Sequence, residues 1–406
     1  MKLKCEETLD SLTSNPSSGL PGVVLAAFNK NGIFYFSAKG QLKEEKGEEI
    51  NLDSTFWGFS CTKLLTTIAV LQCVENGQID LDNPVDGLLP ELREPNIITP
   101  EPNGSFKLTP AKNKITLRHL VSHTSGLSYD AMHPILVAWR ESRGEAPQVM
   151  SGKIPEAYDL PLLFEPGSSW VYGAGLDWAG LLVERLNNIR LAGYMHKKLF
   201  YPLGLDRSTF RPTTRPDVRE GLAQMWRRSE TGVLVPIPSP YPLQARNDSG
   251  GMGLITSTSD FIAILQDLLK DKPVLLKKKS VAEMFIPQFE PGTPQYRGLV
   301  EQQPQSSWSK LTPANAQAMH KQLTGDTTGS PEVAFGLGGL VVQKDVPNLP
   351  AGTLTWNGMP NIGWFVNQDR GLGAIYVSQV LPPGDAKSVG LLGDFWREIW
   401  ARHGEA

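Results

Sequence analysis

The chain has 406 residues, of which 40% are hydrophobic and 20% are charged, and its formal net charge is −3. This composition provides enough apolar material for a large core. The near-neutral charge excludes the strong positive field that binding to nucleic acid or to an anionic membrane requires. We therefore expect a small-molecule partner, with no nucleic acid and no membrane.

The N-terminus and the cysteines favour an intracellular protein. Residues 1–12 carry acidic side chains where a signal peptide needs an apolar run, and the chain has no uninterrupted apolar window of about eighteen residues. Cys5, Cys61 and Cys73 form no CxxC pair, and an odd number of cysteines suits a reducing compartment better than a disulfide framework. We expect a cytoplasmic location.

The first half of the chain begins with a predicted hairpin. Residues 23–28 and 33–38 have the composition of strands, and a turn-forming segment joins them. From residue 60 to residue 75 apolar side chains recur at helical spacing, and Gly77 stands where a helix end commonly requires a positive φ. Further helices are predicted at 116–122, 176–186 and 259–269.

The last part of the chain returns to strands. Short apolar runs between residues 335 and 380 alternate with turns, as antiparallel strands do, and residues 385–402 form an amphipathic helix. Strands at both ends with helices between them predict an α+β fold. We expect one catalytic unit, residues 1–406. Its sheet region, with flanking helices, would comprise about residues 1–58 and 320–406, and a mostly helical region about residues 59–319.

A Ser-x-x-Lys pair, Ser60 and Lys63, lies in FWGFSCTKLLTTIAVLQ at the start of the predicted buried helix. Side chains three residues apart share a helix face, so the lysine can reach the hydroxyl. A serine is a poor nucleophile until a base takes its proton, and a lysine is a base only when burial keeps it neutral. The amide of Ser60 at the helix start can also stabilise an oxyanion.

Spacing alone leaves a second interpretation open, in which Ser60 caps the helix and Lys63 extends to solvent. The same spacing recurs at residues 307–310. That pair lies in a Gln-, Ser- and Pro-rich tract without apolar periodicity, where no helix would hold the two side chains together.

Three further stretches resemble motifs of the serine β-lactamase-like superfamily, in the same order and at similar spacing. They are HLVSHTSGLSYD at 119–130, FEPGSSWVYGAGLDWAGLLVERL at 164–186, and FGLGGLVV at 335–342 followed by TLTWNGMPN at 353–361. The resemblance covers about residues 20–400. It is strongest to class C β-lactamases and family VIII carboxylesterases, and above all to fungal acyltransferases that modify polyketides of the lovastatin type.

This resemblance implies roles for individual residues. Ser60 would be the nucleophile that becomes acylated, Lys63 its base, and Tyr172 the partner that shares the proton relay. The amide of Met359 would complete the oxyanion hole with that of Ser60.

The third motif of the family departs from the β-lactamase pattern. β-Lactamases place a lysine where this chain has Trp356, and an asparagine where it has Ala174. Without these polar anchors we do not expect antibiotic hydrolysis, and the aromatic side chain suits an apolar acyl or polycyclic substrate.

Substrate contacts are predicted for residues of the motifs and for other aromatic side chains. The motifs place Trp356, Asn357, Gly358, Trp170 and Tyr129 in the substrate site. Trp139, Trp226, Trp308 and Trp364 are further candidates for lining an acyl or acceptor pocket, although an aromatic residue taken singly is more often part of the core packing. The long connections 235–253 and 287–318 are candidates to close over the site.

The resemblance implies a serine-dependent acyltransferase of secondary metabolism, which moves an acyl group from a thioester or ester donor to an alcohol of a small natural product. The donor is left open between an acyl carrier protein and coenzyme A. Alternatives are an esterase or thioesterase, the release of a carrier-bound polyketide, and a non-catalytic protein of the same fold. No cofactor or metal is expected, and His119 and His123 lack the glutamate of an HExxH site.

Overall fold

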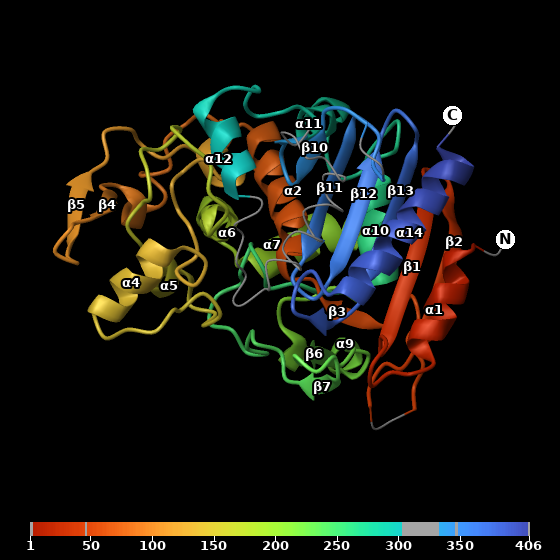
Figure 1. Ribbon diagram of the computed structural model, residues 1–406. Coiled ribbons are helices and arrows are strands. Elements are labelled where there is room, and N and C mark those ends of the chain that lie inside the picture. The colour runs from red at the N-terminus through yellow and green to blue at the C-terminus, as the bar shows by residue number, and fades with distance from the viewer. Residues whose placement is uncertain (1–2, 45–46, 303–332, 346–347, 405–406) are drawn as a thin grey trace.

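A seven-stranded antiparallel sheet joins the two ends of the chain in the computed structural model, which describes residues 3–44, 47–302, 333–345 and 348–404 (Figure 1). This confirms the predicted α+β fold with a sheet from both chain ends. In sheet order the strands are β2 (Gly32–Gly40), β1 (Gly22–Asn29), β13 (Leu372–Val377), β12 (Ile362–Asn367), β11 (Thr353–Gly358), β10 (Leu340–Val342) and β9 (Val333–Phe335).

The first hairpin lies beside the last long strand. β1 pairs with β2 on one side and with β13 on the other, in a register that sets Val24 opposite Val377. All of β1 except Asn29 is buried, as expected for a continuous apolar run between two neighbours. The predicted hairpin is therefore confirmed, and its second strand extends two residues further than expected.

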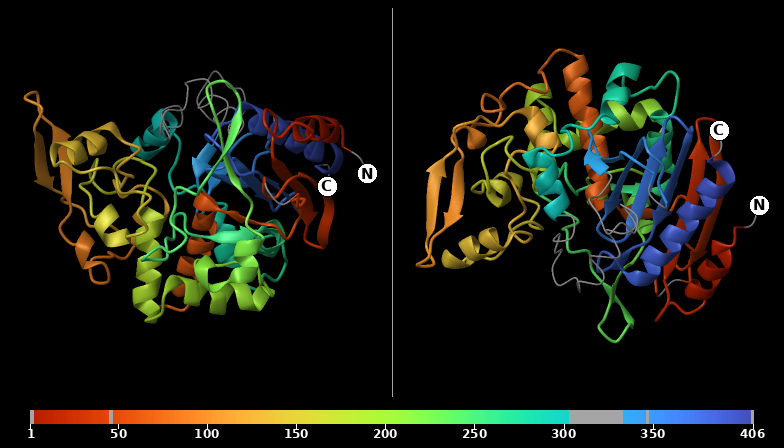
Figure 2. Two further views of the ribbon diagram at one scale, coloured as in Figure 1. Left: turned by 90° about the horizontal axis from the view of Figure 1, so that it is seen from below. Right: turned by 45° about the horizontal axis from the view of Figure 1, so that its top comes forward.

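Helices cover both faces of this sheet (Figures 1 and 2). Helix α14 (Ala386–His403) lies on one face, where an added Cβ at Gly363 would contact Leu392 and Trp396. The next residue along β12 points the other way: the Trp364 ring lies 6.3 Å from Phe261 of α10 (Thr258–Asp267). This alternation buries β12 on both faces.

The middle of the chain contains most of the helices. Helix α2 (Thr62–Glu75) is almost entirely buried and ends before Gly77, whose φ of 68° confirms the predicted helix end.

The other helices of the described residues are α1 (Cys5–Thr13), α3 (Leu117–Val121), α4 (Pro134–Ser142), α5 (Ile154–Tyr158), α6 (Gly175–Asn187), α7 (Leu191–Met195), α8 (Tyr201–Leu203), α9 (Pro216–Glu220), α11 (Lys278–Met284) and α12 (Pro294–Gln302). In the described residues, none of these helices is long and apolar enough to cross a bilayer.

Small sheets also occur in this middle region, which the sequence pattern did not indicate. β4 (Asn96–Pro100) and β5 (Phe106–Pro110) form a hairpin, and β3 (Thr55–Trp57) pairs with β8 (Ile255–Ser257). The third small sheet orders β14 (Val380–Leu381), β6 (Met225–Arg228) and β7 (Leu234–Ile237). Short helical turns are η1 (Phe59–Cys61), η2 (Pro90–Leu92), η3 (His196–Phe200) and η4 (Pro212–Thr214).

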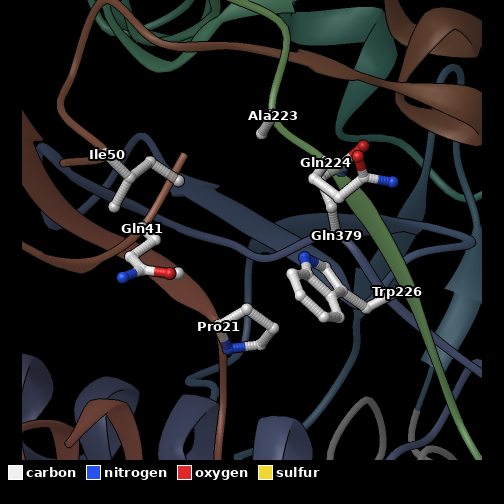
Figure 3. A pocket seen from close by; sticks show the side chains of 8 residues that line it. Pro21, Gln41, Ile50, Ala223, Gln224, Trp226 and Gln379 are labelled. Atoms are coloured by element: carbon white, nitrogen blue, oxygen red, sulfur yellow. The ribbon is translucent and has the colours of Figure 1, made fainter. Parts of the chain in front are cut away.

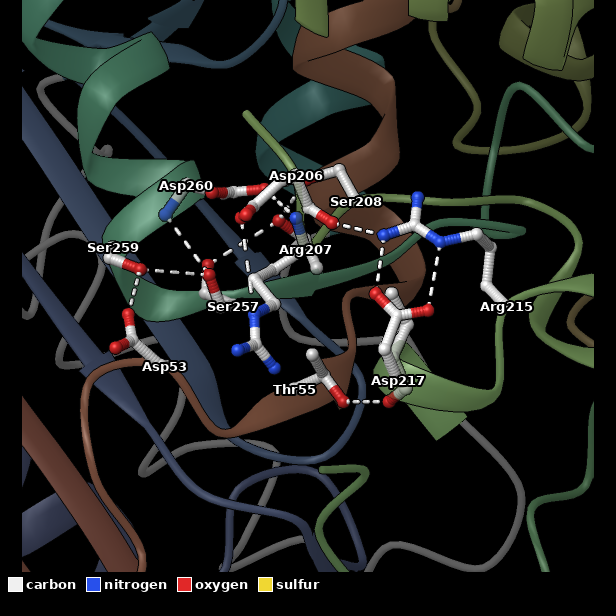
Figure 4. Close-up of polar contacts among 12 residues, drawn as sticks. Asp53, Thr55, Asp206, Arg207, Ser208, Arg215, Asp217, Ser257, Ser259 and Asp260 are labelled. Atoms are coloured by element: carbon white, nitrogen blue, oxygen red, sulfur yellow. Dashed lines mark hydrogen bonds and ion pairs between the residues drawn. The ribbon is translucent and has the colours of Figure 1, made fainter. Parts of the chain in front are cut away.

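Strand β3 leads directly into the turn that carries Ser60, and polar contacts anchor it (Figure 4). The Thr55 hydroxyl donates to the Val218 carbonyl at 2.6 Å, and the Ser259 hydroxyl donates to Asp53 at 2.7 Å. Asp260, in the first turn of α10, accepts from the Ser208 hydroxyl at 2.8 Å. These bonds tie the approach to Ser60 to the start of α10 and to α9.

We expect Thr55→Val to lower the free energy of unfolding by about 1–3 kcal/mol, because the buried Val218 carbonyl loses its donor while the side-chain volume is kept. Urea denaturation would measure the change. Thr55→Ser, which keeps the hydroxyl, is the control and should lose less. Equal losses in the two variants would assign the effect to packing.

Candidate active site

Ser60 lies in a tight turn between β3 and α2. The preceding residue, Phe59, has a φ of 42°, a left-handed conformation that costs a non-glycine residue about 1–3 kcal/mol. The surroundings hold this conformation: the amide of Gly58 donates to the Leu254 carbonyl at 2.9 Å, and the Phe59 side chain is fully buried. The regular α-helix begins at Thr62, two residues later than predicted.

The structure brings Ser60, Lys63 and Tyr172 together. Tyr172 lies in the segment just before α6, and its hydroxyl donates to Ser60 Oγ at 2.6 Å. Lys63 Nζ is 3.3 Å from the same oxygen. All three side chains are buried, so the serine hydroxyl lies between an amine and a phenol in a site largely closed to water.

The environment of Lys63 favours its neutral form. Its side chain is only 2% exposed, which excludes the interpretation in which it extends to solvent. Burial lowers the pKa of Lys63 from 10.5 to about 8, while the charge of Asp177 raises it. A lysine with such a pKa is partly neutral near physiological pH and can accept a proton from Ser60.

A second group of polar atoms surrounds Lys63 on the side away from Ser60. Nζ donates to the Gly251 carbonyl at 2.8 Å and to the Tyr129 hydroxyl at 3.3 Å. Tyr129 in turn donates to Asp177, in the first turn of α6, at 2.8 Å. The structure thus places Tyr129 behind Lys63 and fully buried. Its role in lining a substrate pocket stays a prediction.

Aromatic rings pack around Tyr172. Its ring centroid lies 5.5 Å from that of Trp356 and 6.5 Å from that of Trp170, and Phe335 contacts both tryptophans. The ring of His123 is 4.7 Å from that of Tyr172. Trp356 is half-buried whereas Trp170 is buried, so of the two only Trp356 presents surface to a substrate.

The end of β11 lies against the Ser60 turn. A Cβ added at Gly358 would be 2.6 Å from the Gly58 carbonyl oxygen and 3.2 Å from Cys61 Sγ, so a side chain there would push the strand away. The Met359 amide follows directly, and Asn357 is half-buried beside it. This approach places the third motif next to the nucleophile. The oxyanion role of Met359 stays a prediction.

The other aromatic candidates are in different places. Trp364 is buried in the main sheet, and the Trp139 ring lies 4.8 Å from the guanidinium of Arg143 near α4. Trp226 lines a small pocket with Pro21, Gly22, Gln41, Ile50, Ala223, Gln224 and Gln379, none of which is a predicted site residue (Figure 3). Trp308 and the pair at 307–310 lie outside the described residues.

The connection 235–253 contributes backbone to the site at Gly251, whereas the second half of the tract 287–318, from residue 303, lies outside the described residues. Asp177, Gly251 and His123 were not predicted as site residues. Asp177 carried one signal, because it is the only acid in the apolar run LDWAGLLV of the helix predicted at 176–186. Among the described residues, no cluster of three or more His, Cys, Asp or Glu side chains is placed to hold a metal ion.

Comparisons with known proteins show what the whole chain is similar to. The model of the Beta-lactamase family matches residues 6–392. Acyltransferase calJ of Penicillium decumbens is 35% identical over 348 residues, 84% of this chain and 80% of that protein. Lovastatin esterase of Penicillium rubens is 33% identical over 373 residues, 90% of each chain. A mutant of simvastatin synthase from Aspergillus terreus superimposes with a TM-score of 0.86 at 30% identity, covering 99% of this chain and 97% of that one.

Proposed function

The chain belongs to the β-lactamase family, and from this premise we propose that it is an acyltransferase that works through an acyl-Ser60 intermediate. It moves an acyl group from a thioester or ester donor to an alcohol of a small natural product. The observation that carries the proposal is the position of Ser60 Oγ, 3.3 Å from Lys63 Nζ and 2.6 Å from the Tyr172 hydroxyl in a buried site.

Lys63 and Tyr172 differ in the protonation state that burial favours. The pKa of Lys63 is about 8, so its neutral amine can take the Ser60 proton. Burial raises the pKa of Tyr172 above its ordinary value, although its bond to Ser60 opposes the shift, so the phenol keeps its proton at neutral pH. Lys63 is therefore the base and Tyr172 the donor in the resting enzyme.

The first half-reaction acylates Ser60. As the neutral Lys63 accepts the hydroxyl proton, Ser60 Oγ bonds to the donor carbonyl carbon, and the amides of Ser60 and Met359 stabilise the oxyanion. The carbon–sulfur bond of a thioester donor then breaks. The departing thiolate takes a proton from Tyr172, which recovers one from the Lys63 ammonium, so both groups regain their starting state.

The second half-reaction runs along the same path. The acceptor alcohol gives its proton to Lys63 as its oxygen attacks the acyl carbon, and Ser60 leaves as a hydroxyl after protonation by the same relay. Trp356 replaces the charged anchor of a β-lactamase beside this path, and its half-buried indole favours an apolar acyl chain or acceptor over a β-lactam carboxylate.

A hydrolase is the second candidate, and the likeness to lovastatin esterase favours it. It uses the same acyl-Ser60 intermediate, with water in place of the alcohol. Release of a carrier-bound polyketide is a special case of either reaction. Transfer and hydrolysis differ only in which nucleophile reaches the acyl carbon first, so the partition of the intermediate decides between them.

The test is to acylate the wild-type protein with the butanoyl thioester of N-acetylcysteamine and follow the adduct by intact-protein mass. Alcohols of increasing size are then added, and the ester and free-acid products are measured. We expect alcohols to discharge the adduct faster than water does, with ester as the main product. Free acid alone, at a rate independent of every alcohol, would replace the transferase with the hydrolase.

A further inference from the structure

Lys63 Nζ is held from behind by groups that the reaction above does not use. Besides Ser60, Nζ contacts the Gly251 carbonyl and the Tyr129 hydroxyl. It also lies 4.7 Å above the centre of the Tyr172 ring. A lysine side chain has four rotatable bonds, so its amine is aimed at Ser60 only if such contacts restrict it. Gly251 and Tyr129 supply two of these contacts.

Both contacts lead to the carboxylate of Asp177. One of its oxygens accepts from the Tyr129 hydroxyl at 2.8 Å. The other accepts from the Gly251 amide at 3.1 Å and from the Ser249 hydroxyl. Burial raises the pKa of the Asp177 carboxyl, and the charge of Lys63 together with the three converging donors opposes that shift and favours the ionised carboxylate.

Close packing fixes this arrangement. A Cβ added at Gly251 would lie 2.3 Å from Asp177 Oδ2 and 2.7 Å from the Tyr129 hydroxyl. No side chain fits there, so only a glycine at position 251 can bring its carbonyl this close to Lys63. The Ser249 hydroxyl also accepts from the Met252 amide at 3.0 Å, which closes the turn around Asp177.

We propose that Asp177 is a positioning residue, which holds the amine of Lys63 against Ser60 through Tyr129 and Gly251 and supplies the counter-charge for the lysine ammonium formed during acylation. The proposal rests on the proposed function, since it assigns Lys63 as the base. The described hydrogen bonds of Asp177 include neither Ser60 nor Tyr172, so it acts on Lys63 by its charge and through Tyr129 and Gly251.

The charge of Asp177 has a definite effect on pH dependence. A base must be neutral, so acylation rises with pH through the pKa of Lys63, and the acidic limb of the profile reports that pKa. A nearby carboxylate favours the ammonium and raises the pKa, as it does here against the larger effect of burial. Removing the charge therefore moves the acidic limb to lower pH. The groups that face Lys63 are Ser60, Cys61, His123, Tyr129, Tyr172 and Asp177.

The experiment compares wild type, Asp177→Asn and Tyr129→Phe by the pH profile of acylation with the butanoyl thioester. In Asp177→Asn, which removes the charge, we expect an acidic limb at lower pH. In both variants we expect a high-pH rate reduced by about 10–100-fold, part of the 10²–10⁴ that a positioned base supplies. Tyr129→Phe removes one hydroxyl and keeps the ring, so it carries the test if Asp177→Asn does not fold.

Asp130→Asn is the matched control. Asp130 is also fully buried and also accepts several hydrogen bonds, from Arg140 and from the Gln148 and Val149 amides, but it does not face Lys63. The acidic limb of the Asp130→Asn profile should stay at the wild-type pH even if the free energy of unfolding of this variant falls. An unchanged limb in folded Asp177→Asn, or an unchanged high-pH rate in Tyr129→Phe, would overturn the positioning role. Acylation that survives Ser60→Ala would instead overturn the proposed function, so the two failures are distinguishable.

Discussion

Replacing Ser60 with alanine is expected to abolish the acyl adduct and to reduce thioester consumption by about 10⁴-fold or more, as removal of an enzymatic nucleophile does. Ser60 Oγ is the atom that Tyr172 and Lys63 both contact. The loss should appear both in intact-protein mass and in the steady-state rate.

Cys61→Ala is the control for this result, because a neighbouring thiol can exchange with a thioester. Burial raises the pKa of the Cys61 thiol, which keeps it protonated and poorly nucleophilic. Cys61→Ala should therefore still form the adduct at a rate near that of wild type. An adduct that persists in Ser60→Ala and disappears in Cys61→Ala would assign the nucleophile to the thiol.

Replacing Lys63 with methionine is expected to have two opposite effects. Acylation should fall by about 10²–10⁴-fold, because the base is lost while the shape of the side chain is largely kept. Stability should increase, because burying this lysine disfavours its protonated form. Rates measured by acylation and unfolding measured by urea denaturation would give the two effects on one variant.

The buried Lys63 makes the free energy of unfolding of the wild-type protein depend on pH. The pKa of Lys63 is 10.5 in an unfolded chain and about 8 in the fold, so between these values the unfolded state binds more protons. Loss of the Lys63 proton therefore makes the free energy of unfolding of the protein rise between about pH 8 and about pH 10.5. Below pH 8 the penalty is constant, at about 3 kcal/mol for a shift of this size.

The methionine variant has no such penalty, so its advantage over wild type should be largest near pH 7 and shrink toward pH 10. Lys63→Met that is less stable than wild type at pH 7 would show that the bonds from Nζ to Gly251 and Tyr129 outweigh the cost of burial. The activity loss would still stand by itself, since it depends on the base and not on stability.

Local patterns predicted much of this molecule. The hairpin, helix α2 and the closing helix α14 follow from apolar periodicity and turn residues, and the observed bounds differ from the expected ones by one or two residues. Ser60, Lys63 and Tyr172 were found because each belongs to a motif whose residue types have a chemical reason. The structure places these three together, as expected, although their catalytic roles still need the experiments above.

The groups behind Lys63 could not be predicted in the same way. Gly251 contributes only backbone atoms, its carbonyl and its amide, and a glycine has no side chain that could indicate a partner 188 residues away. Tyr129 was assigned to a pocket because an aromatic residue near a motif often lines one, and its burial depends on tertiary packing that no local pattern reports. Trp364 packs in the core, which is the commoner role for any one of the aromatic candidates, since strand β12 is covered on both faces.

The sheet that joins the two chain ends also constrains how the protein can be made. Strand β1 leaves the ribosome early, but its partner β13 follows only after almost the whole chain has been translated. Until then an apolar strand has one open edge, which is the kind of surface that associates with other chains. Contacts so distant along the chain also slow folding. The nascent protein therefore depends on the cell to keep β1 from wrong partners until the C-terminal strands arrive.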